Sequence, residues 1–204
     1  MQYPAVVESL ALESRQLLRS LSQPTLAPFL ADWPETTQAT RQVCRSSLPV
    51  LRWICTIAED DRGFAVSLIA NLCRAAWSLE WRQTYASNEI GAAFLQNYGW
   101  AEVMGQRASN DASGVACGFL LLGPSTLYPR HGHEAEEIYI PLSGTVHWQQ
   151  GDAVWREKPP GTLVHHDRNE SHAMRTGAEP MLALYLWRSE QLNQKASLDP
   201  EHEK

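Results

Sequence analysis

The sequence predicts a mostly β fold with an α-helical N-terminal part, in which a small β-barrel follows a helical segment. Two uneven distributions of residues lead to this prediction. Eleven of the twelve glycines lie at or after Gly91, and six of the seven histidines fall between His131 and His172. Glycine is typical of the turns between short strands, whereas the glycine-poor front half has apolar side chains at helical spacing. We therefore expect two kinds of structure in one chain, with the reactive side chains in the second.

The overall composition is that of a globular protein and excludes several function classes. The chain has 204 residues, of which 44% are hydrophobic and 20% charged, and its net charge is −6. An acidic chain is a poor nucleic-acid binder, because phosphate recognition needs clustered Lys and Arg. No apolar run approaches the ~18 residues of a membrane span, and the N-terminal residues lack a signal-peptide pattern. We expect a cytoplasmic protein that contacts neither nucleic acid nor membrane.

Residues 1–100 are expected to form a helical segment that packs on the barrel. Apolar side chains at helical spacing predict four helices, over residues 5–22, 48–59, 64–79 and 88–98. Pro24, Pro28 and Pro34 divide the chain after the first helix, and Gly99 follows the last. None of these helices carries an evident cluster of reactive side chains.

Residues 101–190 are expected to form the β-barrel. Short runs rich in β-branched and aromatic residues, bounded by Gly, Pro, Asn or Asp, predict strands within 114–123, 137–151, 161–166 and 181–188. Several short strands at regular spacing indicate a sandwich or barrel. The remaining residues, 191–204, are polar, and we expect them to form a disordered tail.

One stretch of the barrel half has the residue types and spacing of a metal site. His131 and His133 are two residues apart, so they share one face of a strand. Glu137 follows after a bend and can return a carboxylate to that face, and His172 comes later in the chain. Neutral imidazoles with one carboxylate suit one divalent metal ion, which could be iron, zinc, manganese or nickel. The other reading, histidines that face solvent at strand edges, fits isolated residues better than this cluster.

This spacing resembles the first motif of the cupins, and Pro160–Met174 resembles the second motif, with His172 as its ligand. Cupins are jelly-roll β-barrels with one metal in the barrel mouth. The amino-acid sequence around these motifs resembles, more closely than it resembles cupins in general, the cupin-type dimethylsulfoniopropionate (DMSP) lyases of the DddQ-like branch. The segments that carry this resemblance are Trp81–Tyr85, Phe94–Trp100, Gly118–Pro124, His133–Tyr139, His172–Thr176 and Leu182–Trp187. It implies cleavage of DMSP to dimethyl sulfide and acrylate.

The resemblance also implies roles for single residues. The metal ligands would be His133, Glu137 and His172, with His131 close to the metal or bound to it. Tyr139 would lie near or on the metal, where a nearby positive charge favours the phenolate form. We therefore expect Tyr139 to be the general base for β-elimination, with Tyr128, which precedes the histidines, as the second candidate.

A substrate that carries a sulfonium group suits a pocket with aromatic walls, because aromatic faces attract cations. Among the eight tryptophans and six tyrosines we expect Trp187, Tyr185 and Trp81 to contribute to this wall. His165 and His166 are expected to be solvated residues at a strand end, and His147 a structural one.

Other readings of the same site remain open at this point. A cupin with this metal could instead be a dioxygenase or an isomerase that acts on another small carboxylate. It could also be a non-catalytic domain that binds a small molecule. The full ligand set argues against the non-catalytic reading. Cupins commonly dimerise, so a homodimer is possible.

Overall fold

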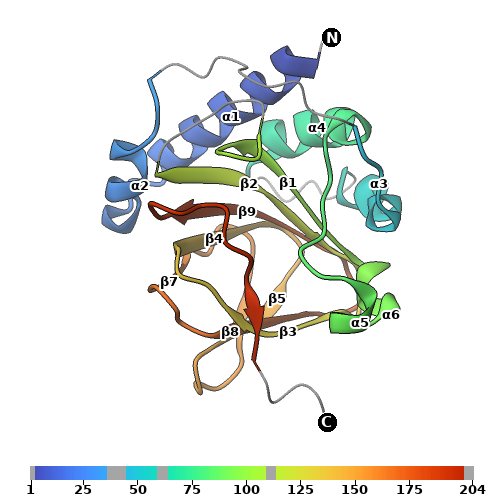
Figure 1. The fold of residues 1–204 in the computed structure, drawn as a ribbon. Helices are drawn as coiled ribbons and strands as arrows, with labels where there is room; N and C mark the ends of the chain where they lie inside the picture. The colour runs from blue at the N-terminus through green and yellow to red at the C-terminus, as the bar shows by residue number, and fades with distance from the viewer. Residues whose placement is uncertain (1–2, 36–44, 59–63, 109–113, 200–204) are drawn as a thin grey trace.

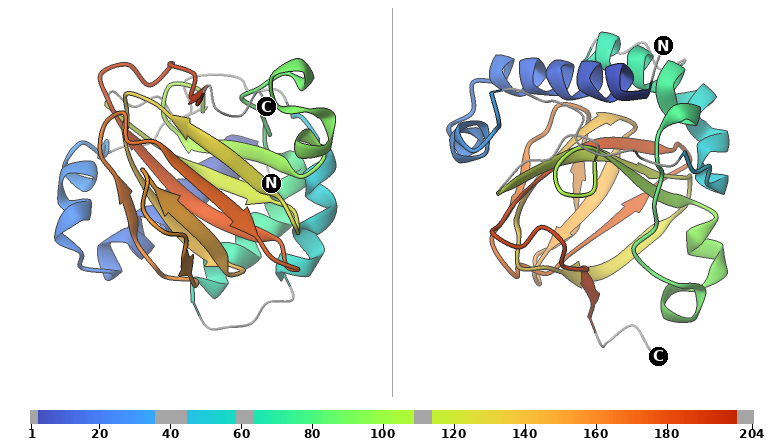
Figure 2. Two further views of the ribbon diagram at one scale, coloured as in Figure 1. Left: turned by 90° about the horizontal axis from the view of Figure 1, so that it is seen from below. Right: turned by 45° about the horizontal axis from the view of Figure 1, so that its top comes forward.

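The computed structural model describes residues 3–35, 45–58, 64–108 and 114–199. Two antiparallel sheets face each other as a flattened barrel, and a layer of helices covers the outer face of one sheet (Figure 1). The views of Figure 2 show the long first helix lying across that sheet, on the side away from the barrel interior. The prediction of a jelly-roll barrel preceded by a helical segment is confirmed.

The helices of the described residues lie almost entirely before the barrel. They are α1 (Tyr3–Ser20), η1 (Pro24–Leu26), α2 (Ala27–Ala31), η2 (Pro49–Trp53), α3 (Ile54–Ala58), α4 (Val66–Ala75), η3 (Ala76–Ser78), α5 (Ser87–Ile90) and α6 (Ala92–Leu95). The predicted helix over 88–98 is divided, because Gly91 adopts a φ of 86° between α5 and α6, and Tyr98 already begins a strand. None of the described helices has both the length and the apolar character needed to cross a membrane.

In the described part of the chain the strands form two five-stranded sheets. They are β1 (Tyr98–Met104), β2 (Val115–Leu122), β3 (Leu127–Gly132), β4 (Glu136–Ser143), β5 (Val146–Gln150), β6 (Arg156–Lys158), β7 (Val164–His166), β8 (His172–Thr176), β9 (Met181–Arg188) and β10 (Ser197–Leu198). One sheet has the order β1-β2-β9-β4-β7 and the other β10-β3-β8-β5-β6. The predicted strand region 137–151 is two strands, joined by a turn in which Gly144 has a φ of 77°.

The central strands β2 and β9 of the first sheet are buried on both faces, which explains why they are almost continuously apolar. All eight residues of β2 are buried. Phe119 and Leu121 point outward to the core shared with α1 and α4, whereas Leu120 and Leu122 point into the barrel. A sheet covered on only one face would alternate apolar and polar residues. The helical layer therefore covers the outer face of the first sheet, and the inward side chains of its strands β4 and β9 face the barrel interior.

The prediction of a disordered tail was wrong for residues 191–198. Ser197 and Leu198 pair with Gly132 and His131 of β3, and Leu192 is fully buried. No apolar pattern in the sequence marks this segment, because polar and main-chain contacts, such as the Asp199 N–H to the Arg130 carbonyl oxygen, hold it in place. The tail beyond Asp199 lies outside the described residues.

Candidate metal centre

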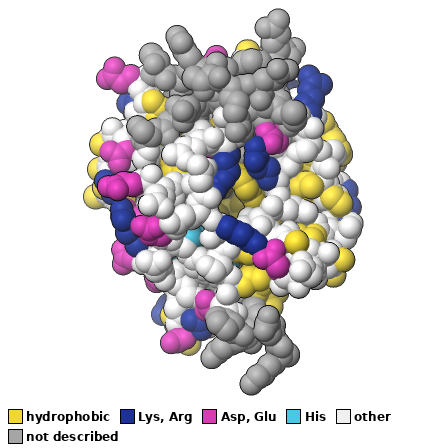
Figure 3. Space-filling model, in the orientation of Figure 1, with side chains coloured by type: hydrophobic (Ala, Val, Ile, Leu, Met, Phe, Trp, Pro, Cys, Tyr) yellow, Lys and Arg dark blue, Asp and Glu magenta, His cyan; other side chains and the backbone are white. Residues whose placement is uncertain are grey.

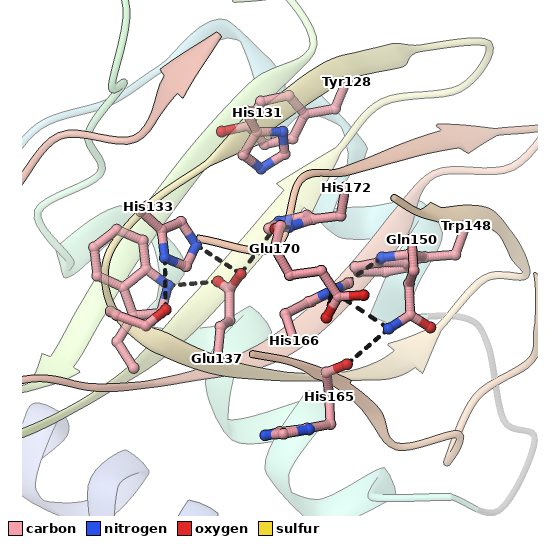
Figure 4. Close-up of polar contacts among 12 residues, drawn as sticks. Tyr128, His131, His133, Glu137, Trp148, Gln150, His165, His166, Glu170 and His172 are labelled. Carbon is pink, nitrogen blue, oxygen red and sulfur yellow. Dashed lines mark hydrogen bonds and ion pairs between the residues drawn. The ribbon is translucent and has the colours of Figure 1, made fainter. Parts of the chain in front are cut away.

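Three buried side chains converge at one end of the barrel interior. His133 follows β3, Glu137 lies near the start of β4 and His172 begins β8, so both sheets of the barrel contribute to the group (Figure 4). One ligand atom from each lies within 4.8 Å of the others. Glu137 Oε2 is 2.9 Å from His133 Nε2 and 3.2 Å from His172 Nε2. The structure thus brings together three of the four residues predicted to bind a metal.

The histidine tautomers are fixed by the main chain. His131, His133 and His172 each donate from Nδ1 to a carbonyl oxygen, at 2.8, 2.9 and 3.0 Å respectively. A carbonyl oxygen only accepts, so Nδ1 carries the proton in each ring and the neutral form has its lone pair on Nε2. Such outer hydrogen bonds are usual for metal-binding histidines, because they orient the ring and its donor atom.

The charges and lone pairs of these three side chains favour the binding of a cation. Burial alone would raise the pKa of Glu137, but His133 and His172 hold it well below the usual range, so the carboxylate stays ionised. Burial lowers the pKa of His133 and the neighbouring carboxylate more than reverses this, so the net direction is upward. His172 Nε2 is buried without a hydrogen-bond partner among the described residues. Two imidazole nitrogens and one buried carboxylate oxygen fit a divalent ion of the zinc, iron, manganese or nickel type.

His131 lies beside this group, but it is not one of the three residues whose ligand atoms converge. Its ring stacks on Tyr128, with centroids 3.8 Å apart and planes inclined by 7°, and it meets His172 edge-on at 4.2 Å. Burial and the nearby His172 keep its pKa well below the usual value, so the ring is neutral. Metal binding by His131 stays a prediction.

Both candidate bases reach the cavity next to the metal centre. Tyr139 lies two residues after Glu137 on the inward face of β4 and is directly opposite Tyr185 of β9. Burial, followed by the charge of Glu137, raises the pKa of Tyr139 well above the usual value. Burial and the neighbouring tyrosines do the same for Tyr128. Each hydroxyl is therefore protonated unless a positive charge is placed close to it.

A cavity of about 470 Å³ opens from the metal centre to the surface. Six aromatic side chains line it, which are Tyr98, Trp100, Tyr128, Tyr139, Tyr185 and Trp187. Pockets of this size and apolar character are typical of small-molecule sites. The predicted wall residues Trp187 and Tyr185 are both among them.

Three basic side chains stand at the mouth of this cavity, and Figure 3 shows Lys and Arg side chains around a hollow with apolar groups inside it. Each is paired with an acidic residue: Arg82 with Glu80, Arg107 with Glu102 and Lys195 with Glu89. The mouth therefore carries no large excess of positive charge. Lys195 also lies over the Tyr85 ring, with its Nζ 5.3 Å from the ring centroid. This contact helps to hold the C-terminal segment at the mouth of the cavity.

The prediction for Trp81 was wrong. Its side chain is 1% exposed and packs in the core between the helices and the first sheet, not against the cavity. Its indole N–H donates to the carbonyl oxygen of Ala76 at 2.9 Å. Trp100 of β1, which pairs with Arg82 through the main chain, lines the cavity together with Trp187 of β9.

The prediction that His166 is a solvated strand-end residue was also wrong. Its ring is fully buried and stacks on His172 at 3.9 Å with planes 17° apart. Trp148 donates its indole N–H to His166 Nε2 at 3.0 Å. His166 lies opposite Glu137 in the pairing of β4 and β7, so it shares the inward face. The adjacent pair His165-His166 gives no sequence signal for which of the two points inward.

Comparisons with known proteins point in one direction. A family model described as dimethylsulfoniopropionate lyase matches residues 30–183. The chain is 33% identical over 138 residues to a putative dimethylsulfoniopropionate lyase DddL of Cereibacter sphaeroides, covering 66% of this chain and 57% of that protein. It is 32% identical over 111 residues to dimethylsulfoniopropionate lyase DddQ of Ruegeria pomeroyi, covering 54% and 55% respectively. The chain thus spans somewhat more than half the length of these curated relatives.

Solved structures match over nearly the whole chain. The crystal structure of DMSP lyase DddQ from Ruegeria pomeroyi superposes with a TM-score of 0.84 at 25% identity, covering 98% of this chain and 99% of that one. A structure from work on the DMSP lyases RdDddP and RnDddQII gives a TM-score of 0.82 at 28% identity, covering 97% and 100%. The helical layer and the barrel are therefore shared, not the barrel alone.

Proposed function

Because the chain belongs to the dimethylsulfoniopropionate lyase family, we propose that it cleaves DMSP to dimethyl sulfide and acrylate by metal-dependent β-elimination. The observation that carries the proposal is the convergence of His133, Glu137 and His172 in the wall of an aromatic cavity that also contains Tyr139. His131 completes the proposed ligand set. A bound divalent ion would act as a Lewis acid, stabilising negative charge on the substrate carboxylate and favouring the phenolate of a nearby tyrosine.

Tyr139 is the proposed general base. Its hydroxyl oxygen, as phenolate, takes a proton from the carbon next to the substrate carboxylate. The electron pair of that C–H bond forms the new C=C bond, and the C–S bond breaks so that its pair leaves with dimethyl sulfide. Tyr139 then returns its proton to solvent before the next turnover. Tyr128 lines the same cavity and is the alternative base.

The aromatic walls are proposed to hold the sulfonium group. Tyr185 and Trp187 line the cavity beside Tyr139, and cation–π attraction contributes roughly 0.5–2 kcal/mol per contact. The expectations of a cytoplasmic location and of a homodimer stay predictions.

Headspace analysis for dimethyl sulfide tests the proposal. The metal-free protein is loaded separately with manganese, iron, zinc or nickel and mixed with DMSP. We expect gas with at least one metal, and none from Tyr139→Phe at unchanged metal content. Dimethyl sulfide from Tyr139→Phe but not from Tyr128→Phe would identify Tyr128 as the general base. Absence of gas with every metal would refute the lyase proposal.

A further inference from the structure

The two oxygens of the buried Glu137 carboxylate have different partners. Oε2 faces His133 and His172, whereas Oε1 accepts a hydrogen bond from the indole N–H of Trp187 at 2.5 Å. Trp187 is directly opposite Glu137 in the antiparallel pairing of β9 with β4. Side chains of directly opposed residues lie on the same face of a sheet. The register of two long, well-packed strands therefore sets this contact.

The indole ring is also held from its other side. It lies 4.2 Å from the His133 ring, with the planes inclined by 34°, and it lines the cavity. The indole N–H is a donor only, and Glu137 is fully buried, so the Trp187 indole supplies Oε1 with the hydrogen bond that solvent would otherwise make. A buried carboxylate oxygen without a donor would be strongly disfavoured.

We infer that Trp187 is a positioning residue, which reserves Oε1 of Glu137 so that the carboxylate presents only Oε2 to a metal ion. A carboxylate can bind a metal through one oxygen or through both. Holding one oxygen in a hydrogen bond favours the first mode and leaves a coordination position for a substrate. This inference rests on the proposed metal centre and gives the cavity wall a second role, in addition to contact with substrate.

Two Trp→Phe variants test the inference. Trp187→Phe keeps an aromatic wall but removes the N–H. Trp100→Phe is the matched control, because its indole lines the same cavity but donates to Thr84 Oγ1 at 3.1 Å rather than to a ligand. Each metal-free protein is titrated with Co²⁺ or Zn²⁺ against a competing chelator, and the visible absorption of the Co²⁺ form is recorded.

We expect Trp187→Phe to bind metal about 10- to 100-fold more weakly than the wild type, the range typical of lost outer hydrogen bonds. Its Co²⁺ bands should weaken, because a carboxylate free to bind through both oxygens raises the coordination number. Trp100→Phe should match the wild type in both measurements. Equal affinity and equal spectra for the two variants would overturn the inference.

A measurement on the wild-type protein covers the case in which Trp187→Phe does not fold. The ¹H–¹⁵N resonance of the Trp187 indole should be protected from hydrogen exchange and should shift when metal is added, while that of Trp100 should not. Rapid exchange of the Trp187 N–H, or no response to metal, would contradict the inference. None of these readouts needs DMSP, so failure of the lyase proposal and failure of this inference are distinguishable.

Discussion

Glu102 gives a quantitative prediction, because the fold buries its carboxyl group on β1 beside the cavity residue Arg107. Oε1 accepts hydrogen bonds from the backbone N–H groups of Arg107 and Ala108, at 2.6 and 3.0 Å. Burial raises the pKa of Glu102 to about 7, although these hydrogen bonds and the Arg107 and Arg82 charges lower it. The carboxyl therefore changes its charge close to neutral pH.

The sign of the effect on stability follows from this direction. The pKa of about 7 in the folded state lies above the ordinary value of 4.5. Between these pH values the folded protein binds a proton that the unfolded chain releases, so the free energy of unfolding falls as the pH rises. At about 1.4 kcal/mol for each unit between the two pKa values, the loss is on the order of 3 kcal/mol. Glu102→Gln keeps an oxygen acceptor and removes the titration, so this loss should disappear.

Urea unfolding followed by tryptophan fluorescence at pH 5 and pH 8 measures the difference. Relative to the wild type, the free energy of unfolding of Glu102→Gln should rise by about 2–3 kcal/mol between pH 5 and pH 8. Glu157→Gln, at an exposed position of β6, controls for the loss of one negative charge and should not show this rise. A difference between Glu102→Gln and wild type that is the same at both pH values would show that Glu102 does not titrate between them.

Three further outcomes are expected. Gly118→Ala places a Cβ within clashing distance of the Ala101 carbonyl oxygen and 2.6 Å from the Tyr185 hydroxyl. It should cost about 1–3 kcal/mol of unfolding free energy and lower kcat/KM, whereas Gly177→Ala, whose Cβ meets nothing within 4 Å, should do neither. His166→Ala removes the ring stacked on His172, a proposed metal ligand, and should weaken metal binding about tenfold in chelator competition. His165→Ala should not weaken it, and equal affinities for the two variants would contradict this expectation. When the metal is present at 100 times its Kd, removing it should lower the free energy of unfolding by about 2.7 kcal/mol and lower Tm by about 5–10 °C in calorimetry. An unchanged Tm would argue against binding at the buried ligands.

The features that depend on local spacing could be predicted from the sequence. His133 and Glu137 are four residues apart around one bend, so their meeting requires only that the bend close. The apolar runs of β2 and β9 identify strands because both faces of these strands are covered. Local spacing also placed Tyr139 on the face of Glu137, since residues two apart on a strand share a face.

The features that depend on strand register could not be predicted. His166 and Trp187 lie against Glu137 because β7 and β9 flank β4 in one particular register, and nothing in the local sequence specifies that register. Trp81 has the same residue type as Trp100, but the bridge between Arg82 and Trp100 sends one ring into the core and the other into the cavity. Residue type alone does not distinguish a core tryptophan from a cavity tryptophan.

We propose above that the chain uses this metal centre for β-elimination of DMSP. The most direct measurement is a ¹H NMR time course of DMSP with metal-loaded protein, with a metal-free sample beside it. We expect acrylate and dimethyl sulfide to appear in equal amounts, at a rate that depends on bound metal. No consumption of DMSP with any divalent metal, or conversion to 3-hydroxypropionate instead of acrylate, would contradict it.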